Sequence, residues 1–120
     1  MNNPIGYRIF FQYLDYIWNE EKPDCLGALL GGMSLLDDGS TADPAYEFDW
    51  NDAIINSKDQ ENPYQIGIQF LKDWLAIGYD KGIDKIRLDM ESNKRLDLWQ
   101  KASHDVLNNN DDPYLNLISN

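Results

Sequence analysis

Two residue types that often carry out chemistry occur once each in this chain of 120 residues. His104 is the only histidine, and it stands beside Asp105 in a segment with the spacing of a surface helix, which favours a solvated side chain over a catalytic base. Cys25 is the only cysteine, and a helix begins near it, so the helix dipole could lower its thiol pKa. A small buried core residue is the commoner role for such a cysteine. We therefore predict no catalytic residue.

Carboxylates are abundant, but their spacing matches no known ligand motif. Asp37-Asp38-Gly39 and Asp111-Asp112 lack the alternating oxygen ligands and the distal glutamate of a calcium-binding EF-hand loop. The glycines at 27, 31 and 32 follow no strand, and no Gly-Lys-Ser/Thr phosphate loop occurs in the chain. We expect neither a metal nor a cofactor. The alternative to a protein-binding function is a small enzyme or a ligand-binding domain, which would use a pair of carboxylates in a pocket between helices.

Negative charge is concentrated in one part of the chain. No lysine or arginine occurs between Lys22 and Lys58. Asp43 is expected to be a helix N-cap, and the carboxylate of Glu47 is expected to stabilise the nearby helix N-terminus. Some of these acidic residues therefore have a local structural role. The remaining charge indicates a surface for a basic partner. The predicted partner-binding residues are Asp37, Asp38, Glu47, Asp49 and Asp52.

The overall composition narrows the class of partner. Ten basic residues stand against 21 acidic ones, so the net charge is −11, which disfavours nucleic acid and anionic membrane surfaces. Solubility alone is the competing explanation of this charge. The start of the chain lacks a secretory signal pattern, and a single cysteine is typical of a reducing compartment. We expect one cytoplasmic domain over 1–120, with a polar linker and a docking tail at 108–120.

Apolar spacing predicts an all-α bundle of five or six helices. The expected helices cover 4–20, 24 to about 32, a stretch from 44, a stretch from 63, 83–90, and about 92–107. The segment 83–90 fits either a helix or a strand, and we favour a helix. The first and fourth helices are expected to supply most of the aromatic core, with Trp18 and Trp74 buried.

Three helix starts are predicted from capping residues. Asp43-Pro44 and Asn62-Pro63 each place an N-cap side chain before proline at the first helical position. Asp24 is expected to cap the second helix, since Pro23 interrupts the chain just before it. These signals set where the helices begin, and so where their charged residues are displayed.

The chain also contains a faint internal repeat. Gln12-Tyr13-Leu14 aligns with Gln69-Phe70-Leu71, and Leu26, Leu29 and Met33 align at the same offset with Ile83, Ile86 and Met90. This pattern predicts two helix-pair halves that pack about a pseudo-twofold axis, and it favours a helix at 83–90. Chance alignment of segments with the same helical period is the alternative.

One stretch of the chain resembles a known class of proteins. Residues 26–44 and 49–54 combine, in order, a Leu-Leu-Gly helix end, an acidic Asp-Gly loop, Ala-Asp-Pro and a helix that contains tryptophan. This half of the chain resembles small bacterial immunity proteins of polymorphic toxin systems, although 45–48 is more aromatic than expected there. The resemblance implies a cytoplasmic protein that is not an enzyme and that neutralises a cognate toxin. Many such toxins are nucleases with positive grooves, which an acidic protein can occlude.

A third functional class stays open beside inhibitor and enzyme. An adaptor or an oligomeric structural subunit would use an exposed apolar patch, and Tyr114 and Leu115 near the end of the chain are the candidates for it.

Overall fold

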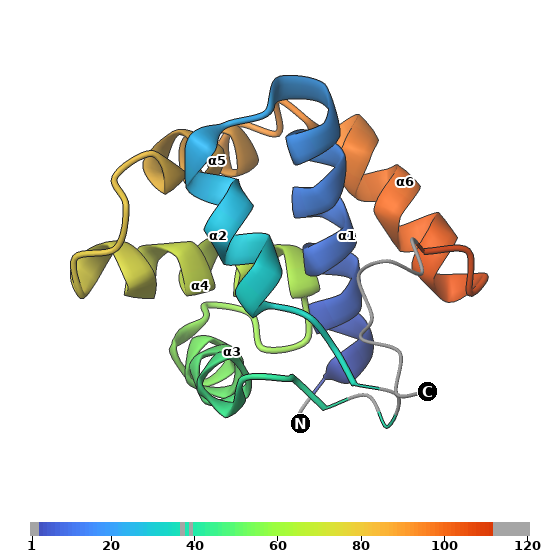
Figure 1. Cartoon of the computed structure of the whole chain (residues 1–120), viewed down its shortest axis with the longest axis horizontal. Helices are drawn as coiled ribbons and strands as arrows, with labels where there is room; N and C mark the ends of the chain where they lie inside the picture. Colours follow the sequence, from blue (N-terminus) through green and yellow to red (C-terminus); the bar gives the residue numbers. More distant parts are fainter. Residues whose placement is uncertain (1–2, 37, 39, 112–120) are drawn as a thin grey trace.

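The computed structural model describes residues 3–36, 38 and 40–111, and this part of the chain forms six helices (Figure 1). They are α1 (Pro4–Glu21), α2 (Asp24–Gly32), α3 (Pro44–Asn56), α4 (Pro63–Ala76), α5 (Ile83–Glu91) and α6 (Leu96–Leu107). The predicted all-α bundle of five or six helices is confirmed, and 83–90 is helical. None of the described helices is both long enough and apolar enough to cross a membrane.

The last helix begins later than predicted. Residues 92–95 form a turn, in which Asn93 has a φ of 57° and the backbone N–H of Lys94 donates to the carbonyl of Asp89 at 2.9 Å. Asparagine tolerates this left-handed conformation, which is a common way to end a helix. The turn therefore closes α5 and delays the start of α6 to Leu96.

The predicted caps at the starts of α3 and α4 are confirmed. Asp43 Oδ1 accepts a hydrogen bond from the backbone N–H of Ala45 at 3.0 Å, and Asn62 Oδ1 accepts one from Tyr64 at 3.0 Å. The predicted cap at Asp24 is wrong. Pro23 occupies the N-cap position, and Asp24 is the first residue of the helix, where its carboxylate favours the positive end of the dipole.

The aromatic core is built mainly by α1 and α4, as predicted. Figure 1 shows α4 passing behind α1 and α2 near the centre of the molecule. The buried aromatic residues of α1 are Tyr7, Phe10, Phe11 and Tyr13, and those of α4 are Tyr64, Phe70 and Trp74. Trp50 of α3 completes this core. Trp74 is buried as expected, whereas Trp18 is only partly buried against the core.

The two halves of the chain repeat one tertiary hydrogen bond. The hydroxyl of Tyr7 donates to the carbonyl of Met33 at 2.8 Å, and the hydroxyl of Tyr64 donates to the carbonyl of Met90 at 2.7 Å. These four residues are related by the same offset as the sequence repeat. The first half contains α1 to α3 and the second half contains α4 to α6. The third helix of each half packs on the first helix of the other half, since α3 packs on α4 and α6 packs on α1. The bonds and the packing thus agree with the predicted repeat.

Buried tyrosines make the fold sensitive to alkali. Burial is the main reason that the pKa values of Tyr7 and Tyr13 lie well above the ordinary value of 10.0. Their contribution to stability is complete below the pKa of an unfolded tyrosine and is lost as the pH rises above about 10. In an alkaline titration, we expect the tyrosinate absorbance of these buried tyrosines to appear only well above pH 10, together with the loss of the helical circular dichroism signal. Ionisation of every tyrosine near pH 10 with the helices intact would contradict this.

Candidate functional site

The loop between α2 and α3 displays the first of the predicted partner-binding carboxylates. Asp37 lies outside the described residues. Asp38 is exposed. Its Oδ1 accepts one hydrogen bond from the hydroxyl of Ser40 and a second, at 2.9 Å, from the backbone N–H of Ser40. These bonds hold the pKa of Asp38 below its ordinary value of 3.8, so this carboxylate is charged at neutral pH. An antiparallel bridge between Leu35 and Thr41 closes the loop.

The carboxylates of α3 do not all lie on one side of the helix. Successive residues of an α-helix are rotated by about 100°, so Glu47 and Asp49 lie at opposite edges of the face that carries the buried Trp50. Asp52 points to solvent, on the same side as Asp49. The helix therefore brings Asp49 and Asp52 together and separates them from the half-buried Glu47.

A shallow hollow of about 160 Å³ joins Asp49 and Asp52 to α4. Its third carboxylate belongs to Asp73, and Trp74 and Ile77 also line it. Asp49 Oδ2 accepts a hydrogen bond from the indole N–H of Trp74 at 2.9 Å, which fixes this carboxylate against α4. Three carboxylates beside apolar surface are suited to receiving the ammonium or guanidinium group of a partner's side chain.

Each Asp73 oxygen has a different environment. Oδ1 accepts a hydrogen bond from the side-chain amide of Gln69 at 2.8 Å. Oδ2 is buried and has no hydrogen-bond partner among the described residues. Asp73 is not among the predicted contact residues, because only the packing of α3 on α4 places it beside Asp49 and Asp52.

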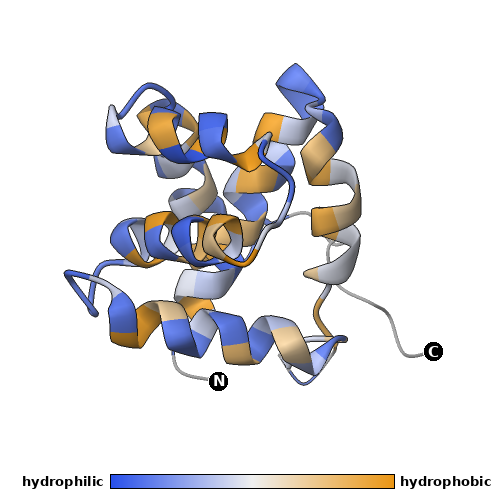
Figure 2. Ribbon diagram, turned by 90° about the vertical axis from the view of Figure 1, so that its left-hand side faces the viewer, coloured by the Kyte–Doolittle hydropathy of each residue, from blue (hydrophilic) through white to orange (hydrophobic). Residues whose placement is uncertain are grey.

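Exposed apolar residues accompany this negative surface. Phe48 and Ile55 of α3 are each 69% exposed, and Ile77 beside the hollow is 78% exposed. In Figure 2, α3 lies lengthwise along the lower edge of the molecule and mixes hydrophobic with hydrophilic residues. These three residues are not among the predicted contact residues either. For Phe48 and Ile55, the sequence feature that indicates an exposed apolar pair is their seven-residue spacing, which puts both on one side of the helix, away from the face that packs on the core.

We use the name acidic face for the exposed side of α3 together with the end of α4, namely Phe48, Asp49, Asp52, Ile55, Asp73 and Ile77. A protein interface commonly has apolar contact residues with charged groups around them. The acidic face has both, because Phe48, Ile55 and Ile77 supply apolar area while its three aspartates supply negative charge. Its geometry suits a partner that carries both apolar and basic groups.

The residues that could act as nucleophile or base lie elsewhere. His104 is exposed on α6, with its Nδ1 3.5 Å from a carboxylate oxygen of Asp105. Cys25 is buried, and its burial raises the pKa of the thiol, which disfavours the reactive thiolate. Among the described residues, no group of three histidine, cysteine or acidic side chains is arranged to hold a metal ion.

Comparison with known proteins adds no further assignment. The chain has no significant match among models of protein families, among curated proteins or among solved structures.

Proposed function

We propose that this domain is an immunity-type protein, which binds and neutralises a cognate bacterial toxin through its acidic face. The observation that carries this proposal is the interval between Lys22 and Lys58, in which no basic residue offsets the carboxylates of the loop and α3. Such a surface attracts a positively charged groove and speeds the encounter with it. The resemblance of residues 26–44 and 49–54 to immunity proteins supports the same proposal.

The size of the hollow favours a partner's side chain over a free substrate. Pockets that hold small-molecule ligands usually measure roughly 300–1,000 Å³, whereas the hollow between α3 and α4 measures about 160 Å³. Asp49 is already hydrogen-bonded to Trp74, so it is less available for acid-base chemistry. An enzyme that uses this carboxylate cluster is therefore the weaker candidate. The adaptor alternative rests on Tyr114 and Leu115, which lie outside the described residues.

The decisive experiment uses the protein encoded next to this one. If the neighbouring reading frame encodes a secreted protein with a variable C-terminal region, that region is produced with and without this domain. We expect a stable complex in size-exclusion chromatography and normal growth of cells that make both proteins. Growth arrest despite equal amounts of this domain, with no complex formed, would refute the proposal.

A further inference from the structure

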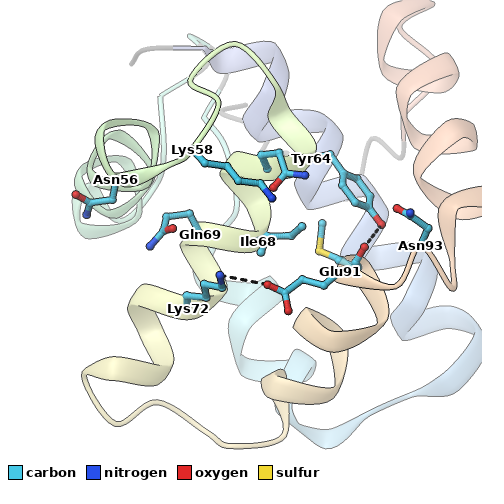
Figure 3. Close-up of a pocket in the computed structure, with 10 residues that line it drawn as sticks. Asn56, Lys58, Tyr64, Ile68, Gln69, Lys72, Glu91 and Asn93 are labelled. Carbon is cyan, nitrogen blue, oxygen red and sulfur yellow. Dashed lines mark hydrogen bonds and ion pairs between the residues drawn. The ribbon is translucent and has the colours of Figure 1, made fainter.

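A second and larger hollow, of about 350 Å³, lies between the end of α3, the outer side of α4 and the end of α5 (Figure 3). The lysines of this hollow are Lys58, in the linker after α3, and Lys72 on α4. In Figure 3 their side chains border the hollow on two sides, with Ile68 between them. None of the residues that line it belongs to the predicted partner-binding set.

The charge of this hollow is opposite to that of the protein. Lys58 makes no ion pair among the described residues, whereas Lys72 Nζ lies 3.2 Å from a carboxylate oxygen of Glu91. That carboxylate is shared, since Arg87 Nη1 lies 2.7 Å from its other oxygen. The lining thus holds two ammonium groups and one carboxylate, in a chain whose net charge is −11. An anion that enters the hollow meets an excess of positive charge.

The other lining groups are polar at the rim and apolar at the base. The side-chain amides of Asn56, Gln65 and Asn93 line the hollow and make no hydrogen bond within the described residues. Ile68 and Met90 are buried and supply an apolar base. The bond from Tyr64 to the carbonyl of Met90 ties α4 to α5 at this point, so the hollow is held open by the fold.

We propose that this hollow binds a small organic acid that has one carboxylate and an apolar body. The carboxylate lies between Lys58 and Lys72 and accepts hydrogen bonds from the rim amides, while the apolar body covers Ile68 and Met90. A single negative charge matches the excess of one positive charge in the lining. A phosphate ester carries about −1.5 to −2 at neutral pH and usually pairs with arginine, which is absent from the described lining.

The test compares two probes of the same shape, 4-methylpentanoate and its neutral amide, 4-methylpentanamide. Each is titrated into the isotopically labelled protein, and the amide signals of Gln65, Gln69 and Asn93 are followed by NMR. We expect saturable shifts with the acid and none with the amide. A third probe, N-acetylglycyl-leucine, presents the same carboxylate at the end of a peptide. Tighter binding of the peptide assigns the ligand to a polypeptide C-terminus, and tighter binding of 4-methylpentanoate assigns it to a free acid.

Two double variants locate the binding site. Lys58→Gln with Lys72→Gln is expected to weaken binding of the acid by at least about tenfold, because both charge-assisted hydrogen bonds are lost. Lys22→Gln with Lys101→Gln changes the net charge equally, at lysines that lie over the rings of Trp18 and Tyr16, and is expected to bind as the wild type does. Equal shifts with acid and amide, no saturable shift, or equal binding by the two variants would overturn the proposal.

Discussion

Replacement of Trp50 by alanine is expected to destabilise the protein by about 3–5 kcal/mol, since the change opens a large void in the core. Trp50 is 0% exposed, and its ring centroid lies 5.6 Å from those of Tyr7 and Phe10 and 5.8 Å from that of Phe70. The Trp50 side chain of α3 therefore packs between the aromatic residues of α1 and those of α4. Urea unfolding followed by circular dichroism gives the free energy of unfolding of the variant and of the wild type.

Two further variants separate packing from hydrogen bonding. The indole N–H of Trp50 is buried and has no hydrogen-bond partner among the described residues. Trp50→Phe removes this costly donor and leaves a smaller void, so its loss is expected to be only about 1–2 kcal/mol. Trp18→Ala is expected to cost less than Trp50→Ala, because Trp18 is only partly buried. Equal losses for all three variants would show that Trp50 is not the centre of the core.

Reversal of two exposed aspartates, Asp38 of the loop before α3 and Asp52 of the acidic face, is expected to slow association with the toxin by at least about tenfold. Asp38→Lys with Asp52→Lys places positive charge where the proposed partner is itself positive. Both residues are exposed, and the hydrogen bonds of Asp38 lie within its own loop, so the helical fold should remain intact. Asp49 is left unchanged, because its bond to Trp74 would confuse a loss of binding with a loss of structure. Surface plasmon resonance at low and high salt measures the association rate, which should fall with salt for the wild type.

A matched variant distinguishes a local surface from the total charge. Asp59→Lys with Glu61→Lys changes the net charge by the same amount, in the exposed linker before α4. If the loop before α3 and the acidic face form the contact surface, this control slows association much less than the reversal of Asp38 and Asp52 does. Equal effects of the two double variants would mean that only the overall charge matters. Unchanged rates in both would refute an electrostatic interface altogether.

The sequence by itself determined the helices and most of their limits. Periodic apolar residues, and an N-cap followed by proline at Asp43-Pro44 and Asn62-Pro63, act within a few residues of each other, so their effects can be predicted without the fold. The repeat was also visible in the sequence, and it corresponds to the paired bonds of Tyr7 and Tyr64. Local signals were insufficient at Asp24 and at residues 92–95, where the neighbouring backbone conformation decided the helix start.

Only the tertiary structure decided which side chains share a surface. Asp49 and Asp73 are on different helices, and the packing of α3 on α4 brings both to one hollow with Asp52. The same packing leaves Phe48 and Ile55 exposed, and the arrangement of the α3 end, α4 and α5 places Lys58 beside Lys72. Such neighbours depend on where helices cross and how they are rotated about their axes. Those quantities arise from side-chain packing across the whole core, which the spacing of residues along one helix does not specify.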